Sequence, residues 1–320
     1  MESLQATKTR LKAVKNVGQI TKAMEVVAAT KMRRAQEVAL NSRPYAYEAL
    51  HFLKRLVGHS ALKSQLSQVR KISKTLVVIM ASDRGLAGSF NGQVFKVADQ
   101  FFTTDSLKQS PEHEYLTMAV GKKSVGYIGR KKYKLLHSFD NSLDVTSLEG
   151  IAPITKILVD GFLNKDWDRV VTISTHFRTA LKQEPLLRQI LPLSFEKIKE
   201  TIEEIVPEYG RYSEQKGELT EESPVLKKNI SKAEEIDYIF EPSPKVILES
   251  LTPHLVDMQI YHLFLEAKAS EHSARRIAMK TASDNAVDLG DALTLEYNKS
   301  RQVGITRELA EITTTIMTLE

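Results

Sequence analysis

Glycines cluster between Ser82 and Gly92, where the chain reads SDRGLAGSFNG. The segment follows an apolar run and precedes a helical pattern, which is where phosphate-binding loops occur in α/β folds. Its spacing matches neither the dinucleotide fingerprint nor a P-loop with its Lys-Ser/Thr. We therefore expect a glycine-rich turn in which Asp83 or Ser89 caps a helix, with nucleotide binding as the less favoured alternative.

The eight histidines form no ligand pattern. His254 and His262 are eight residues apart, but no carboxylate or third histidine stands at metal spacing. His176 follows a predicted strand, a position that can be catalytic, yet no serine elbow accompanies it. The chain contains no cysteine, which excludes disulfides, thiolate nucleophiles and thiolate metal sites. The sequence therefore predicts no catalytic residue, no metal site and no cofactor.

The middle of the chain, about residues 75–195, alternates between two periodicities. Five runs have the composition of strands, and three intervening segments have helical patterns. The strand-like runs are Thr75–Ser82, Tyr115–Val120, Tyr133–Phe139, Val170–Thr175 and Leu186–Leu193, and the helical segments are Gln93–Phe102, Ser124–Lys131 and Leu148–Asn164. Alternation of this kind predicts a partly parallel sheet covered by helices, a Rossmann-like α/β domain.

Each end of the chain predicts one long helix, residues 2–58 and 244–319, with kinks near Arg43 (before Pro44) and at Pro253. Ser243 and Pro244 are typical of a helix start. Apolar positions recur in steps of three, four or seven in the first helix: Leu4, Leu11, Val14, Val17, Ile20, Met24, Val27, Ala28, Ala35 and Val38. The last helix carries a stripe rich in small residues: Ile260, Leu263, Ala267, Ser270, Ala274, Ile277, Ala278, Ala282, Asn285, Leu289, Ala292, Leu295, Val303, Leu309, Ile312 and Ile316.

Neither stripe is broad enough to predict burial from all sides, so each helix needs a partner, and the nearest is the other. The predicted fold is α/β plus a long coiled coil, in which antiparallel N- and C-terminal helices form an axle. The expected domains are residues 1–60 and 243–320 for the axle helices, 70–195 for the α/β domain, and 196–242 for a charged connector that is mobile or only partly helical.

Charge is unevenly distributed along the chain. Residues 1–34 hold eight Lys/Arg against two acids, a net +6, whereas the whole chain has a formal net charge of +5. Residues 196–237 hold twelve acids and seven bases, a net −5. A basic helical end indicates a negatively charged partner, whether nucleic acid, lipid head groups or an acidic protein surface.

No run of residues is long and apolar enough for a membrane span. The N-terminus has neither the apolar core of a signal peptide nor the composition of a transit peptide. We therefore expect a chain that stays in a cytoplasm and can still dock on a membrane protein.

Four segments resemble the ATP synthase gamma subunit family. Lys15–Gln36, KNVGQITKAMEVVAATKMRRAQ, resembles the opening helix of that family, and Ser82–Asn91 resembles its loop after the first strand. Ser270–Lys280, SEHSARRIAMK, and Tyr297–Leu309, YNKSRQVGITREL, are similar to its closing helix. The likeness runs over nearly the whole chain in the right order, and the two terminal motifs are highly specific.

The resemblance implies the central rotor shaft of a bacterial, proton-translocating F-type ATP synthase, on the cytoplasmic side of the cell membrane and without a catalytic site of its own. It implies partners: a ring of alternating alpha and beta subunits around the axle, with the epsilon subunit and the membrane c-ring against the α/β domain. No nucleic acid is implied. The chain would be a peripheral membrane protein through this complex, coupling ion transport to ATP synthesis from ADP and phosphate.

Contact residues follow from the same resemblance. Met24, with Arg275 or Arg276, would lie near the moving lever of a beta subunit. Arg301, Gln302, Thr306 and Glu308 would meet the catch loops higher on the axle. Tyr238 and Glu241 lie in a segment, YIFEP, that resembles the family's segment near the rotor ring.

Two other functions are compatible with parts of the sequence. A coiled-coil scaffold with an α/β head could dock on anionic lipid or nucleic acid through its basic helix. An enzyme could use the Gly85–Gly92 loop. Neither alternative predicts both terminal motifs together.

Overall fold

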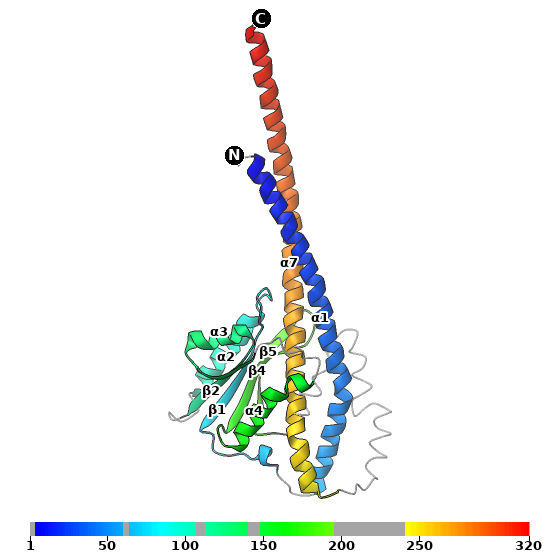
Figure 1. Ribbon diagram of the computed structural model, residues 1–320, viewed down its shortest axis with the longest axis vertical. Coiled ribbons are helices and arrows are strands. Elements are labelled where there is room, and N and C mark those ends of the chain that lie inside the picture. The colour runs from blue at the N-terminus through cyan, green and yellow to red at the C-terminus, as the bar shows by residue number, and fades with distance from the viewer. Residues whose placement is uncertain (1–3, 60–63, 107–112, 140–147, 195–240, 320) are drawn as a thin grey trace. The chain divides into compact units, whose positions relative to one another are not determined.

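The computed structural model describes residues 4–59, 64–106, 113–139, 148–194 and 241–319 (Figure 1). Its contacts divide the chain into two units, one of Met1–Ala29 with Arg275–Glu320 and the other of Thr30–Ala274. Two helices, α1 (Leu4–His59) and α7 (Pro244–Leu319), contribute residues to both units. Residues 196–240 of the predicted connector, Tyr238 among them, lie outside the described residues.

The starts and interruptions of the long helices follow local chemistry. The Val246 N–H lies 3.4 Å from the Ser243 hydroxyl, and the Ile247 N–H donates to the Ser243 carbonyl. Ser243 therefore caps α7, as predicted, and Pro244 opens it because the first helical turn needs no N–H from that residue. Neither Pro44 nor Pro253 ends its helix. The kinks at these prolines stay predictions.

The unit Thr30–Ala274 contains a five-stranded sheet in the order β3-β2-β1-β4-β5. Strands β1 to β4 pair in parallel, and β5 pairs antiparallel to β4. The strands are β1 Lys74–Met80, β2 Glu114–Val120, β3 Lys134–Phe139, β4 Arg169–Phe177 and β5 Gln183–Leu191. The helices of this domain are α2 Phe90–Ser106, α3 Lys122–Lys131 and α4 Ala152–Leu163, with short 3₁₀ turns at Gln65–Ser67 and Leu148–Gly150.

Every predicted strand and helix of the α/β domain is present, with shifted ends. Strand β4 runs two residues further than predicted and β5 begins three residues earlier. These extensions pair with each other, Phe177 opposite Gln183, so they form a hairpin that single-strand patterns do not reveal.

The two faces of the sheet bury separate cores, because side chains alternate between faces along each strand. Helices α2 and α3 cover one face, where Val77, Ile79 and Ile173 pack. Helix α4 and parts of α7 and α1 cover the other, where Leu76, Val78 and Val170 pack (Figure 1). The α/β domain thus has three layers, and segments of the two terminal helices belong to its second core.

Helix α7 is buried on all sides where it crosses this domain. Every residue from Met258 to Glu266 is buried. The prediction that neither terminal helix is buried from all sides is therefore wrong here. The reason is that the sheet covers one side of α7, while α4 and α1 contribute to the same core.

In the unit of Met1–Ala29 with Arg275–Glu320, α1 and α7 lie side by side and antiparallel (Figure 1). The buried residues of α1 here include Thr7, Thr21 and Ala28. The protected positions of α7 recur in steps of three and four: Met279, Ser283, Ala286, Gly290, Leu293, Tyr297 and Ser300. The coiled coil of the sequence analysis is confirmed, but small and polar residues supply much of its inner face.

The predicted register of α7 in this unit is wrong by one residue. The expected stripe ran through Ala278, Ala282, Asn285, Leu289 and Ala292, each one position before a residue of the observed stripe. On α1, the expected positions Val17, Ile20 and Val27 are exposed. Apolar residues therefore line the outside of the coiled coil as well as its inside.

Gly18 makes a close approach possible between the two helices. A Cβ built on Gly18 would lie 3.4 Å from the Ala286 Cβ, an ordinary van der Waals contact. We expect Gly18→Ala to stabilise α1 by up to about 1 kcal/mol, because alanine favours helix over glycine. Gly18→Leu should instead lower the free energy of unfolding by about 1–3 kcal/mol through overpacking. Urea unfolding measures both variants, and equal stability for alanine and leucine would contradict the close approach.

Candidate partner-binding surface

The glycine-rich loop pairs its polar groups internally. Asn91 Oδ1 accepts a hydrogen bond from the Ser82 N–H at 3.0 Å, and Asn91 Nδ2 donates to the Ser82 hydroxyl at 2.8 Å. The Asp83 carboxylate accepts from the N–H of Lys122, the first residue of α3, at 3.0 Å. Asp83 thus pairs with the start of α3, whose N-cap residue is Gly121, rather than with the helix that follows the loop. Capping of that following helix by Asp83 or Ser89 stays a prediction.

Backbone packing and α7 fill the remaining space beside this loop. Gly121, before α3, has φ +91°, and a Cβ there would come within 2.1 Å of the Ala81 carbonyl oxygen. Phe264 and Glu271 of α7 line a hollow with Phe90 that holds about 10 Å³, too little for more than about one water molecule. This hollow at the carboxyl end of β1 is therefore too small for a nucleotide.

The singled-out histidines are packed rather than assembled into a site. His176 is buried within β4, so the prediction that it follows a strand is wrong by the two residues through which β4 continues. His262 is buried, and His254 Nε2 lies 2.7 Å from the Tyr45 hydroxyl. Within the described ranges, no three His, Cys, Asp or Glu side chains gather as a metal site requires.

A buried carboxylate lies beside His176. Glu266 of α7 is 5% exposed, and its Oε2 lies 3.1 Å from Arg188 Nη1 and 3.2 Å from His176 Nδ1. Burial raises the pKa of Glu266, but the Arg188 guanidinium and then His176 act more strongly in the opposite direction, so the pKa lies below its ordinary value. This group is an internal ion-pair cluster that holds α7 against β4 and β5.

The predicted contact residues on the coiled coil fall into two groups. Gly18 lies opposite Ala286, so antiparallel pairing places Met24 about one helical turn from Arg276 along the axis. Met24 and Arg276 are half-buried, and Arg275 is buried. The structure thus places this first group, predicted for the beta-subunit lever, in neighbouring turns of the coiled coil.

The second group lies further along α7. The same pairing sets the first described residue of α1, Leu4, about level with Ser300. Arg301, Gln302, Thr306 and Glu308 therefore lie beyond the described start of α1, and all four are exposed. Glu241, before α7, is also exposed.

Exposed apolar side chains extend over the same unit. On α1 they include Val17, Ile20 and Val27, which are 51%, 59% and 55% exposed. On α7 they include Val287, Leu289, Leu295, Val303, Ile305, Leu309 and Ile312. Large apolar residues gathered in this way are typical of a surface that a protein partner covers.

The described part of the chain has no helix that combines the length and apolar character needed to cross a membrane.

Known proteins resemble this chain over nearly its whole length. A family model described as ATP synthase matches residues 3–319. Among curated relatives, the ATP synthase gamma chain of Opitutus terrae is 37% identical over 98% of this chain and 97% of that protein. The ATP synthase gamma chains of Geobacter metallireducens (36% identical) and Roseiflexus castenholzii (35%) cover the same shares of both chains.

Solved structures share the fold at lower identity. A chain in the rotor of Euglena gracilis mitochondrial ATP synthase has a TM-score of 0.58 at 17% identity, with 94% of this chain and 98% of that chain covered. A chain in the central stalk and c-ring of Tetrahymena thermophila mitochondrial ATP synthase has a TM-score of 0.52 at 20% identity, with 82% and 99% covered. From its sequence relatives and the family model, the chain belongs to the ATP synthase gamma chain family.

Proposed function

We propose that this chain is the central shaft of an F-type ATP synthase, coupling ion-driven rotation of a membrane ring to the catalytic cycle of beta subunits that make ATP from ADP and phosphate. The observation that carries the proposal is the apolar exterior of the coiled coil, together with family membership. Its side chains are exposed in the single chain, and a surrounding ring of subunits would cover them.

The apolar exterior suits a part that turns inside its partners. Hydrophobic contact has no directional requirement, so one face can replace another without breaking specific bonds. A ring that grips Val17, Ile20 and Val27 would keep much of that contact as the shaft turns. A small number of directional polar contacts are proposed for Arg301, Gln302, Thr306 and Glu308. These contacts would form only at certain rotational positions of the shaft.

The mechanism is a population shift. A shaft built from two unlike helices presents a different face to each beta subunit of a pseudo-threefold ring. Contact with a given face favours one conformation of the subunit that meets it, and rotation passes that preference to the next. Met24 with Arg275 or Arg276 would act on the beta-subunit lever.

The remaining parts of the chain have proposed places in this scheme. Residues 1–60 and 243–320 would form the shaft, and the α/β domain, residues 70–195, would rest against the epsilon subunit and the c-ring with Tyr238 and Glu241 nearby. The connector, residues 196–242, has no assigned role. The chain would be a non-catalytic subunit held peripherally on the cytoplasmic side of a bacterial cell membrane.

Affinity capture of this chain from detergent-solubilised membranes tests the proposal. We expect alpha, beta and epsilon subunits and the c-ring to be recovered in constant ratios. The captured fraction should also hydrolyse ATP. Recovery of anionic lipid or nucleic acid without alpha and beta subunits would instead support the scaffold alternative. Saturable nucleotide binding by the isolated chain would support an enzyme.

A further inference from the structure

One face of α7 carries buried polar side chains, among them Glu266, Ser270 and Ser273. Their spacing of four and three residues places them in one row along the helix. A stretch of helix that packs in a core would ordinarily present apolar residues in such a row. The polar row therefore needs a reason.

All three side chains reach the hairpin of β4 and β5. Glu266 lies against Arg188 of β5 and His176 of β4, with the 3.1 Å and 3.2 Å contacts given above. The Ser270 hydroxyl lies 3.4 Å from the Thr175 carbonyl oxygen in β4.

Ser273 completes the row at the turn of the hairpin. Its hydroxyl donates to the Ala180 carbonyl oxygen at 2.6 Å and lies 3.4 Å from Gln183 Nε2. The row therefore contacts both strands and the turn between them, over about two turns of α7.

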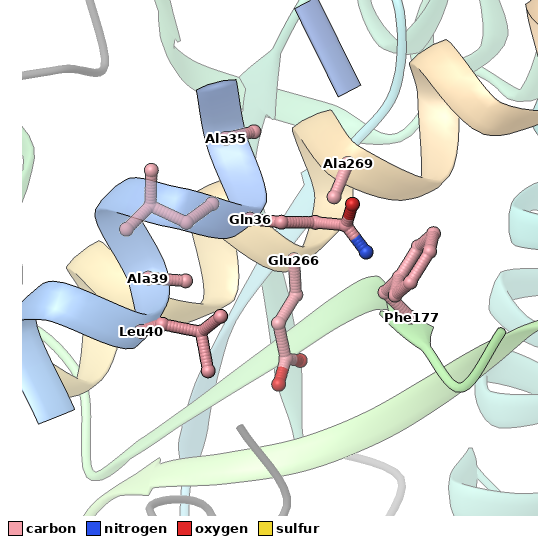
Figure 2. Close-up of a pocket in the computed structure, with 8 residues that line it drawn as sticks. Ala35, Gln36, Ala39, Leu40, Phe177, Glu266 and Ala269 are labelled. Atoms are coloured by element: carbon pink, nitrogen blue, oxygen red, sulfur yellow. The ribbon is translucent and has the colours of Figure 1, made fainter. Parts of the chain in front are cut away.

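The second carboxylate oxygen of Glu266, Oε1, is buried and has no hydrogen-bond partner among the described residues. Glu266 also lines a hollow of about 20 Å³ together with Gln36 and Ala39 of α1, large enough for about one water molecule (Figure 2). Glu266 thus stands where α1, α7 and the hairpin meet.

A buried ion pair is a poor choice for stability alone. Removing two charges from water costs so much that well-packed apolar residues of similar size often stabilise a core equally or better. An ion pair adds a geometric requirement, because its hydrogen bonds are lost when the two elements shift relative to each other. Apolar packing, by contrast, tolerates a small rotation of one element over another.

We infer that Glu266, Ser270 and Ser273 form a torsional anchor that fixes α7 against the β4–β5 hairpin, with Glu266 as its main positioning residue. The inference rests on the proposed function, in which torque applied to the α/β domain must turn the shaft helix. The anchor stiffens that joint.

The test distinguishes the effect of the anchor on rotational stiffness from its effect on thermal stability. Glu266→Leu alone removes the carboxylate beside Arg188, whose side chain is 12% exposed, and should lower the thermal stability of the complex. Glu266→Leu with Arg188→Met removes both charges and should recover most of that stability. A matched control is Glu249→Leu, which changes an exposed glutamate of the same helix.

The decisive readout is the angular fluctuation of a probe on the α/β domain while the alpha–beta ring holds the shaft paused. We expect the variance at least to double in Glu266→Leu/Arg188→Met, with ATP hydrolysis unchanged and with parental variance in the control. Ser270→Ala/Ser273→Ala, which removes only two hydroxyl groups, should also increase the variance.

Parental variance in both double variants would overturn the anchor. That outcome is distinct from failure of the proposed function, which would show as an unmodified chain that does not assemble with alpha and beta subunits.

Discussion

Replacing Arg301 and Gln302 together with alanine is expected to lower ion-driven ATP synthesis by about tenfold or more. A tenfold loss corresponds to about 1.4 kcal/mol, and truncation of an arginine that acts as an interface hot spot costs at least about 2 kcal/mol. Both residues are exposed in the single chain, so their loss should leave its folding unchanged. Synthesis by membrane vesicles that carry the variant complex measures the effect.

Arg130→Ala is the matched control for this pair. Arg130 is an exposed arginine at the end of α3, in the α/β domain. The control should retain parental synthesis. If the Arg301/Gln302 variant also retained it, these residues would not be the contacts through which the shaft reports its angle.

The second large effect is expected from charge on the apolar exterior of the coiled coil. Ile20→Glu combined with Val27→Glu should prevent assembly with alpha and beta subunits. Burying an isoleucine or valine side chain is worth about 1.5–3 kcal/mol, and burying an unpaired carboxylate costs several kcal/mol more. The isolated variant should unfold at the parental urea concentration, because both positions are already exposed in the chain. Size-exclusion chromatography of the co-expressed subunits measures assembly.

Leu181→Glu provides the comparison, since Leu181 is 83% exposed in the turn between β4 and β5. The same change in chemistry there should leave assembly intact. Normal assembly of the Ile20/Val27 variant would show that partners do not enclose this part of α1.

The α/β domain was predictable because its elements differ in period. Runs such as Leu76–Ala81 are too short and apolar for a surface helix, and the helices between them begin near glycine or proline. The hairpin of β4 and β5 was harder to predict, because its first pairs involve Phe177 and Gln183, whose neighbours carry no alternating pattern.

The pairing of the two terminal helices was predictable, but the residues that face inward were not. Apolar residues ordinarily mark the inner face of a helix pair, and Val17, Ile20 and Leu289 were assigned there for that reason. In this chain the outer face is apolar too, so hydrophobic periodicity does not separate inside from outside. The small residues of the inner face, such as Gly18 and Gly290, give no competing signal.

The ion-pair cluster was missed, although one signal existed. Glu266 directly follows the apolar run Leu263–Leu265, and a glutamate next to core residues is seldom buried unless it is paired. The identity of that partner depends on Arg188 and His176, which are distant in sequence and meet Glu266 only through the sheet. Sequence periodicity carries no information about such contacts.

Direct observation of rotation is the most direct test of the account. The chain has no cysteine, and Gly126 of α3 is exposed with nothing within 4 Å of a built Cβ. Gly126→Cys therefore gives a single labelling point on the α/β domain. With the alpha–beta ring fixed to a surface and ATP supplied, the probe should turn in one direction and pause at three positions per turn. A probe that stays fixed relative to the ring while ATP is hydrolysed would contradict the account.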